Sequence, residues 1–379
     1  MVTGWIVFTS RGGEYAHAEI GLIRPDGAEE RYLHFDVPGQ VSWQAGPVFS
    51  DGERIILHSV EDEKTWEHTS VSHLWVYNMR TCALTEIATR ERPADFMPPA
   101  ALLPDQERII INPIIRGKQC VMTMNLDGSD QEFVTRPEDG FTYCIAASPD
   151  WTRLAFHLAE APNYHIVVTN LDGSGRTVVA RHTDHLYFGP QWSSDGEWLL
   201  FQDCHSPTDP EHFRADLCIA RPDGSEMRLV TEGQSHWFGA AYGTPESRAS
   251  GSNIARWSPR ERVCTYTRLR SGSRTAWRHN PNPAYDDHFN RDYVPEQARG
   301  GSQICLLNPF TGNLRPITPI IERVWDFRAV WSGDGSKIAF CRAPVGQPAG
   351  LWVMDDDPSG ARLLTRGRLG LGADHPAWV

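Results

Sequence analysis

Hydrophobic residues along this chain come in short runs separated by polar turns, and the arrangement recurs at intervals. Each copy has an apolar run, a turn rich in Ser, Pro, Asp and Gly, and a second apolar run, which is the pattern of a β-hairpin. The copies are GPVFSDGERIILH (46–58), PPAALLPDQERIII (98–111), CIAASPDWTRLAF (144–156), GPQWSSDGEWLLF (189–201), NIARWSPRERVCTY (253–266) and RAVWSGDGSKIAF (328–340).

A second pair of predicted strands follows each hairpin, as in IVVTNLDGSGRTVVA and DLCIARPDGSEMRLVT. Four antiparallel strands per repeat are the unit of a propeller blade. The N-terminal strands, which begin with GWIVFTS (4–10), lack a first strand, and HPAWV (375–379) supplies it. The pattern therefore predicts an all-β, seven-bladed β-propeller that is a single domain over residues 1–379. Its ring is closed by the C-terminal strand, which pairs into the N-terminal blade and removes an exposed sheet edge.

The spacing of PxWSxDG and xxDGS in these copies resembles the TolB-type propeller repeat over essentially the whole chain. Such a repeat specifies a fold and says little about function. Because strand direction alternates, the connections from strand two to three and from strand four to the next blade share one face, here termed the long-loop face. Nearly all the irregular, His-rich sequence falls there, so we expect function on that face. The longest connection, 267–302, is expected to fold over it as a lid or substrate wall.

Composition narrows the classes of protein. Hydrophobic residues make up 40% of the chain, enough for a large core, and the net charge of −12 without a Lys/Arg cluster argues against a nucleic-acid surface. No apolar run approaches membrane-spanning length, and the first twenty residues lack the features of a signal peptide. We therefore expect a cytoplasmic protein without nucleic-acid or membrane partners, a lost export signal being the alternative. The eight cysteines show no CxxC or zinc spacing and are expected to be buried thiols. The sequence leaves the oligomeric state open.

The segment FQDCHSPTDPEHFRADLCIARPDGSEMRLVTEGQSHWFG (201–239) resembles the corresponding blade of oligogalacturonate lyases. In that family a strand ending in Cys-His leads to an Arg before the third strand, and a His-containing segment follows the fourth. The matching residues here are Cys204, His205, Arg214 and His236. The resemblance implies that Arg214 stabilises the substrate carboxylate or transition state and that His236 abstracts a proton. An oligosaccharide would then be the partner.

The family's metal site is matched only in part. Its last ligand run corresponds to GLGADHPAW, where only His375 remains, and its first ligand falls near ERVWDF, which has no His. A divalent metal, manganese or calcium, would need ligands rebuilt from neighbours, for which the candidates are His375, His205 and His288. The resemblance therefore leaves the presence of a metal open.

The chemistry of the Arg and His pair is consistent with β-elimination at a 4-linked uronate. The proton α to a carboxylate becomes acidic when a cation stabilises the developing enolate, and a neutral His can accept it near neutral pH. Other residues of the long-loop face are candidates for substrate binding, although several could equally be core residues. They are His185, His205, Tyr187, Trp237, Trp277, Arg323 and Trp325.

Two alternatives stay open at this point. One is a non-catalytic TolB-like propeller that binds a glycan or a protein. The other is a glycoside hydrolase, which needs two carboxyl groups flanking the bond. Candidate carboxyl groups on the long-loop face are Asp286, Asp287, Asp326 and Asp374.

Overall fold

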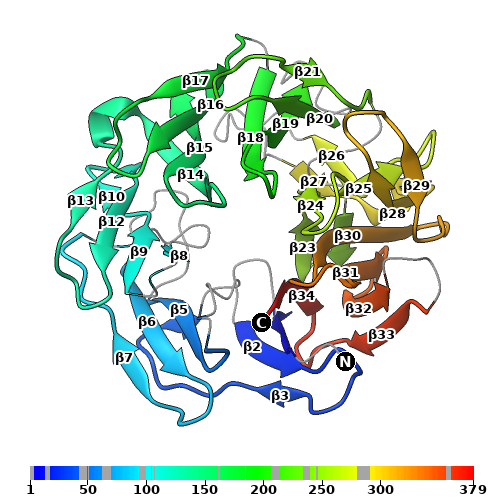
Figure 1. Cartoon of the computed structure of the whole chain (residues 1–379). Helices are drawn as coiled ribbons and strands as arrows, with labels where there is room; N and C mark the ends of the chain where they lie inside the picture. The colour runs from blue at the N-terminus through cyan, green and yellow to red at the C-terminus, as the bar shows by residue number, and fades with distance from the viewer. Residues whose placement is uncertain are drawn as a thin grey trace.

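The computed structural model places the chain as a ring of β-sheets (Figure 1). It describes residues 4–12, 18–41, 49, 51–61, 70–91, 93, 100–103, 105, 107–160, 163–183, 185–205, 214–233, 240–244, 246–279, 291–355 and 360–379. Within them the only helical pieces are the 3₁₀ turns η1 (Pro137–Asp139) and η4 (Pro295–Gln297). The prediction of an all-β protein is confirmed.

Five antiparallel sheets of the described residues have four strands each. Two of the strand orders run from the rim inward, β3-β2-β1-β34 and β13-β12-β9-β8. The other three run from the centre outward, β4-β5-β6-β7, β24-β25-β28-β29 and β30-β31-β32-β33. The strands of the first two are β1 Ile6–Arg11, β2 Ala18–Ile23, β3 Arg31–Tyr32, β34 Gly372–Trp378, β4 Gln40–Val41, β5 Arg54–Val60, β6 Ser72–Asn78 and β7 Leu84–Glu86. Those of the others are β8 Ala100–Leu102, β9 Arg108–Ile111, β12 Met122–Asn125, β13 Glu132–Phe133, β24 Arg256–Trp257, β25 Cys264–Leu269, β28 Ser302–Leu307, β29 Leu314–Pro316, β30 Val324–Trp331, β31 Lys337–Pro344, β32 Gly350–Asp355 and β33 Arg362–Thr365.

A larger sheet of eight strands consists of two groups of four. The groups are β14 Phe141–Ala147, β15 Arg153–Glu160, β16 Asn163–Asn170 and β17 Thr177–Ala180, followed by β18 His185–Trp192, β19 Leu199–His205, β20 Arg214–Ala220 and β21 Arg228–Leu229. A single parallel pairing, of Tyr164 with Leu186, links the two groups into one sheet. The C-terminal strand β34 pairs antiparallel with β1, from Ile6 opposite Trp378 to Arg11 opposite Gly372. The chain ends therefore meet in one sheet.

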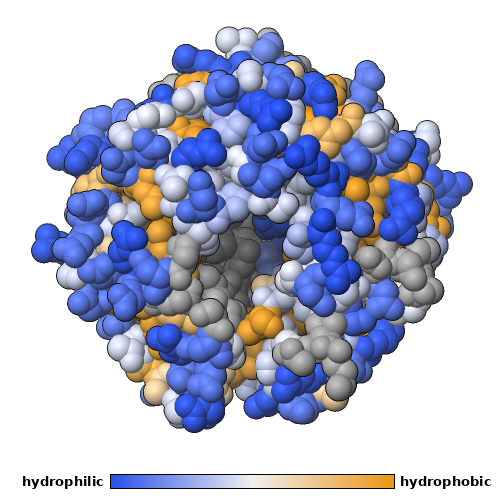
Figure 2. Space-filling view, viewed as in Figure 1, coloured by the Kyte–Doolittle hydropathy of each residue, from blue (hydrophilic) through white to orange (hydrophobic). Residues whose placement is uncertain are grey.

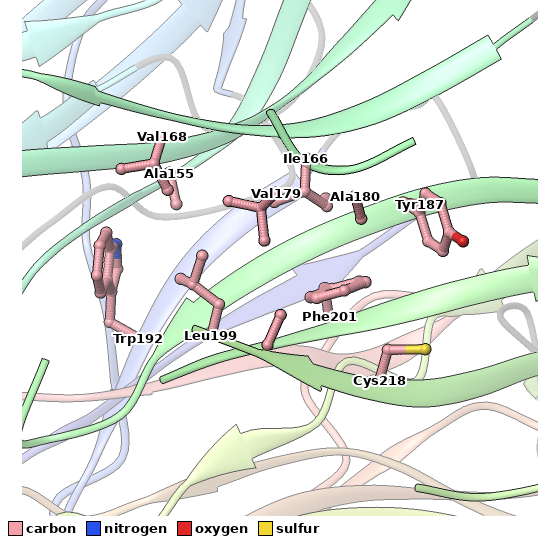
Figure 3. Close-up of a cluster of buried hydrophobic side chains, with 11 residues drawn as sticks. Ala155, Ile166, Val168, Val179, Ala180, Tyr187, Trp192, Leu199, Phe201 and Cys218 are labelled. Atoms are coloured by element: carbon pink, nitrogen blue, oxygen red, sulfur yellow. The ribbon is translucent and has the colours of Figure 1, made fainter. Parts of the chain in front are cut away.

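The core lies between neighbouring groups of strands. One cluster of buried side chains from β15 to β20 includes Ile166, Val179, Trp192 and Phe201 (Figure 3). The tryptophan of the PxWS motif packs here because alternate residues of a strand point to the same face. Hydrophilic side chains cover most of the face seen in Figure 2, which is hollowed at the centre of the ring.

Four innermost strands share a β-bulge that sequence patterning did not reveal. In β14, β18, β30 and β34, two residues lie opposite one buried phenylalanine of the next strand. The first bulge residue has a positive φ in each strand, for Cys144 (53°), Gly189 (58°), Arg328 (50°) and His375 (48°). A side chain in this conformation costs roughly 1–2 kcal/mol, and glycine avoids the cost.

Short hairpins are inserted between the sheets. They are β10 Ile114–Ile115 with β11 Lys118–Gln119, β22 Ala240–Gly243 with β23 Arg248–Gly251, and β26 Trp277–His279 with β27 Arg291–Tyr293. The last belongs to the long 267–302 connection. Tyr293 joins two of these hairpins, because its hydroxyl donates to the Gly243 carbonyl over 2.7 Å.

No helix among the described residues is long and apolar enough to cross a membrane. All eight cysteines are free, and six of them are buried. Cys82 is exposed and Cys144 is half-buried, so the expectation of buried thiols holds for six.

Candidate functional site

Three of the predicted site residues lie in one row across neighbouring strands. His185 opens β18, His205 ends β19 and Arg214 opens β20. The strand register places His185 opposite His205, and His205 opposite Arg214. Residues from three consecutive strands are thus brought to one end of a rigid sheet, as expected for the long-loop face. The side chains of His205 and Arg214 lie outside what the structure describes.

Asp203 holds the imidazole of His185. Both carboxylate oxygens of Asp203 lie 2.8 Å from Nδ1 of His185. The Asp203 side chain is 5% exposed and that of His185 is 27% exposed, so the carboxylate is buried behind a ring that reaches solvent. A carboxylate at Nδ1 fixes the ring orientation and favours the tautomer with the proton on that nitrogen. The arrangement suits proton transfer at the opposite nitrogen, Nε2.

A second buried carboxylate extends this polar end of the sheet. Asp216 lies opposite Asp203 in the register of β20 and β19 and is 2% exposed. Its Oδ1 accepts a hydrogen bond from the Thr231 hydroxyl over 3.1 Å. Burial raises the pKa of the thiols of Cys204 and Cys218, and the charges of Asp203 and Asp216 raise it further, so both side chains are thiols rather than thiolates at neutral pH. Cys204, the Cys of the Cys-His pair, therefore contributes packing.

Three predicted site residues, His236, Trp237 and His288, lie outside the described residues. The first two precede β22 in the chain, and the third falls between β26 and β27. Their roles stay predictions.

The structure corrects two substrate-binding assignments. Tyr187 is 4% exposed and packs edge-on against Phe201 at 5.6 Å, within the cluster drawn in Figure 3. Trp325 is fully buried beside Tyr242 and Phe327. Neither ring offers a face to a sugar, because both fill space between strands. In the sequence, an aromatic residue near a strand end looks the same whether it packs in the core or stacks on a sugar. The burial of Tyr187 and Trp325 in the structure shows that both belong to the core.

Two other substrate-binding candidates have local contacts. Trp277 is half-buried and meets Tyr293 edge-on at 5.6 Å across the β26–β27 hairpin. Arg323 is exposed, and its guanidinium donates to the carbonyls of Ala298 (3.1 Å) and Pro295 (3.2 Å). Arg323 thus fastens the turn η4, and contact of either residue with substrate stays a prediction.

A buried charged cluster surrounds Asp374 in the innermost strand β34, and it is named the Asp374 centre. The carboxylate is 0% exposed and binds the guanidinium of Arg11 at 3.1 Å. Its other partners are the guanidinium of Arg328, the hydroxyl of Tyr242 and the backbone N–H of His375. Burial alone would raise the pKa of Asp374, but Arg328, His375 and Arg11 hold it well below its usual range. Asp374 is therefore ionised.

His375, predicted as a metal ligand, belongs to this centre. Its Nδ1 lies 3.2 Å from Asp374. Burial, and then the charge of Arg328, lower the pKa of His375 to about 3, so the ring is neutral at neutral pH. A divalent cation does not fit here, since the neighbouring carboxylate is occupied by two guanidiniums that would repel it. Across the described residues, no group of three or more His, Cys, Asp or Glu side chains could hold a metal ion.

Of the four carboxyl groups considered for glycoside hydrolysis, the structure describes those of Asp326 and Asp374, and arginines bind both. Asp326 is 1% exposed and accepts two hydrogen bonds from Arg342, at 2.6 and 2.8 Å. Asp374 is held by Arg11 and Arg328. Asp286 and Asp287 lie outside the described residues. Carboxylates bound by buried arginines are structural ion pairs, which disfavours the hydrolase alternative.

Sequence reasoning missed Asp203, Arg11, Arg328 and Tyr242 as members of these clusters. A comparison of the internal repeats would have singled out two positions. Asp203 is aligned with Ser10, Ser59, Leu158, Arg268 and Arg342 in the other second strands. Asp374 is aligned with Tyr143, Phe188 and Phe327. Asp374 is therefore an acidic residue where three other strands have an aromatic residue, and Asp203 is acidic where none of the aligned residues is.

Comparison with solved structures shows which folds the chain is similar to. It is similar to puromycin hydrolase in an S511A mutant complex (12% identity, TM-score 0.61), covering 94% of this chain and 51% of that one. It is similar to an oligogalacturonate lyase in complex with manganese (15% identity, TM-score 0.57), covering 96% and 85%. TolB from Acinetobacter baumannii is also similar (16% identity, TM-score 0.43), covering 83% and 69%. This chain therefore spans about half of the puromycin hydrolase.

No family model matches the chain. No curated protein matches it in sequence. At these identities the solved structures establish the fold alone: the protein is a β-propeller, similar in fold to the β-propeller domain of the Trilobed protease from Pyrococcus furiosus (13% identity, TM-score 0.55) and to oligogalacturonate lyase.

Proposed function

We propose that the propeller has seven blades and that β34 closes the ring. Counting the eight-stranded sheet as two blades gives seven groups of four strands among the described residues. The pairing of β34 with β1 supports closure, because it joins the two chain ends in one blade. A closed ring leaves no innermost strand unpaired, which removes an edge available for aggregation.

We propose further that the protein is a carbohydrate-active lyase that cleaves short uronate-containing oligosaccharides by β-elimination. The observation that carries this is the row of His185, His205 and Arg214 at one sheet end, with Asp203 buried behind His185. A base and a cation at the end of a rigid sheet are the minimum set for the reaction. The overall likeness to an oligogalacturonate lyase supports the same class.

The proposed reaction places each group at a defined step. A neutral histidine removes the proton at C5, α to the uronate carboxylate, while Arg214 binds that carboxylate and stabilises the enolate. The C4–O bond then breaks, a C4=C5 double bond forms, and the departing oxygen takes up a proton. Two histidines are candidates for the base. They are His236, from the sequence resemblance, and His185, whose ring Asp203 orients.

Kinetics on a panel of uronate oligomers test this proposal. A 4,5-unsaturated product absorbs near the ultraviolet edge, so turnover is read directly. His185→Gln and His236→Ala identify the base, because loss of it should lower kcat by on the order of 10²-fold or more with little change in binding. Arg214→Lys should weaken both binding and rate, since lysine lacks the bidentate geometry. Absence of unsaturated product from every oligomer would refute the lyase.

A second candidate is a non-catalytic propeller that binds a glycan or a protein segment. The observation in its favour is that this chain matches about half of the puromycin hydrolase chain, so a propeller of this kind occurs as one part of a larger protein. This candidate predicts ligand binding by the intact protein without turnover and normal binding by the His236→Ala variant.

A further inference from the structure

Arg256 in the innermost strand β24 is a half-buried cation whose side chain binds a neutral partner. Its Nη1 donates a hydrogen bond to Oε1 of Gln191 in β18, the innermost strand of the neighbouring group of strands. Among the residues that the structure describes, no carboxylate forms an ion pair with Arg256. The buried Asp326, by contrast, binds Arg342. Arg256 therefore carries a positive charge that the described carboxylates leave unmatched.

The surroundings of Arg256 make this charge unfavourable. Burial lowers the pKa of Arg256 below its ordinary value, because the guanidinium is partly withdrawn from water. The group stays protonated near neutral pH, since an arginine starts from a pKa of about 12.5 or above. A charge that leaves water without a counter-charge lowers the stability of the folded protein. An anion bound beside the guanidinium would remove that cost.

The fold itself does not require an arginine at this place. The register of each first strand with its second strand aligns Arg256 with one residue in each of four other innermost strands. All four are uncharged, and they are Ala146, Gln191, Val330 and Ala377. The same position is thus filled without a cation in β14, β18, β30 and β34. A role in binding explains the arginine where packing does not.

Other groups close to Arg256 come from two further innermost strands. Burial raises the pKa of the Cys144 thiol to about 12, and the charge of Arg256 and the backbone N–H of Gly189 both oppose this rise. The guanidinium and this N–H therefore lie near the same thiol, which stays neutral. Their strands, β14, β18 and β24, border the centre of the ring (Figure 1), where the surface is hollowed (Figure 2). A cation and a backbone N–H are the donors that proteins use to bind anions.

We propose that Arg256 forms an anion-binding site at the centre of the ring and that this site takes one small, singly charged anion. A guanidinium has five N–H donors, so Arg256 binds Gln191 and a ligand together. Gln191 orients the guanidinium without neutralising it, because its amide is uncharged. One unmatched positive charge is balanced by one negative charge, as carried by a halide ion or a single carboxylate.

This site is separate from the row of His185, His205 and Arg214. Gln191 and His185 lie in the same strand, β18, but six residues apart, which is roughly 20 Å along an extended strand. The inference therefore does not rest on the proposed lyase activity.

Thermal unfolding of the full chain in chloride-free buffer, with sodium chloride or sodium acetate added, tests the site. Each salt that binds should raise the melting temperature of wild type to a saturating value, because the anion binds the folded state. Arg256→Gln should melt at or above wild type without anion, since it removes an unmatched charge. Calorimetric titration should give it an affinity for the anion about tenfold or more below that of wild type. Glutamine is compatible with the strand because Gln191 occupies the equivalent place in β18.

Arg262→Gln is the matched control for the loss of one positive charge. Arg262 lies in an exposed turn and binds Asp195 at 2.7 Å, so this variant should respond to anions as wild type does. Saturable stabilisation of wild type and Arg262→Gln, but not of Arg256→Gln, supports the site, and the salt that binds more tightly identifies a halide or a carboxylate.

Three results would overturn the site. The first is that neither salt stabilises wild type in a saturable way. The second is that Arg256→Gln and Arg262→Gln respond alike, whether both keep the effect or both lose it. The third is that Arg256→Gln fails to fold, since an unmatched cation is not needed for folding. Formation of unsaturated product plays no part in any of these measurements, so failure of the site and failure of the lyase proposal are distinguishable.

Discussion

The bulges of β18 and β34 share a proline and a tryptophan at the same places but have very different surroundings. In β18 the residues are Phe-Gly-Pro-Gln-Trp (188–192), and in β34 they are Asp-His-Pro-Ala-Trp (374–378). Proline and tryptophan occupy the same places, so the scaffold is common to both. Phe188 packs with Leu186 and Cys204, whereas Asp374 binds two arginines and a tyrosine. Three of the five residues differ, and with partners from other strands these differences turn a packing position into a charged centre.

The largest expected effect is that of Asp374→Asn. This change removes the buried negative charge that Arg11 and Arg328 bind, which should lower the free energy of unfolding by about 3–5 kcal/mol. Phe188→Leu, at the equivalent place in β18, should cost about 1 kcal/mol because it changes only packing. Denaturant titrations of both variants give the comparison. A loss below about 1 kcal/mol for Asp374→Asn would contradict the charged centre.

The His185–Asp203 pair gives a second contrast, between catalysis and packing. Asp203→Asn removes the carboxylate that orients the His185 ring, so turnover on the best uronate oligomer should fall by roughly tenfold or more, with a smaller change in KM. Asp216→Asn, directly opposite in the sheet, serves as control because Asp216 contacts Thr231. If turnover fell equally in both variants, the role of Asp203 would be structural rather than the positioning of His185.

The glycine of the β18 bulge should tolerate substitution less well than an ordinary glycine. Gly189 has φ of 58°, so Gly189→Ala should destabilise the protein by about 1 kcal/mol. Gly333 is the control, because a Cβ there meets no atom within 4 Å and its φ is not positive. Thermal unfolding of the two alanine variants compares a side chain placed at the positive-φ bulge with one placed at an open, ordinary glycine. Identical melting temperatures would mean that the bulge imposes no strain.

The smallest effect concerns pH and the ion triad around His73 in β6. Burial alone would lower the pKa of His73, but hydrogen bonds to Glu86 and Glu61, each 2.8 Å, raise it above its ordinary value. The charged form is favoured in the folded protein, so this stabilisation is complete below the unfolded pKa of about 6.5 and is lost as pH rises through the higher folded pKa.

Both glutamates of this triad are more than 40% exposed, so the contribution should stay below about 1 kcal/mol. The difference in unfolding free energy between wild type and His73→Gln should shrink as pH rises from 5 to 9. A difference that grows with pH would have the wrong sign.

The sequence was sufficient for the strands and for the row at the end of β18, β19 and β20, because alternation and turn residues determine both. It was insufficient for the bulges, since three of the four bulge residues are not glycine and carry no local signature of positive φ. The Asp374 centre joins residues up to 363 positions apart, a contact that local patterns do not encode. The β22–β23 hairpin, AAYGTPESRASG (240–251), was missed because small residues replace the usual alternation of polar and apolar positions.

The most direct test of this account is turnover of uronate oligomers by chelator-treated protein. The proposed stabilisation of the enolate by Arg214, rather than by a metal ion, predicts that the 4,5-unsaturated product forms at the same rate with and without chelator and that added Mn²⁺ changes nothing. Turnover that stops with chelator and returns with Mn²⁺, or no unsaturated product from any oligomer, would contradict it.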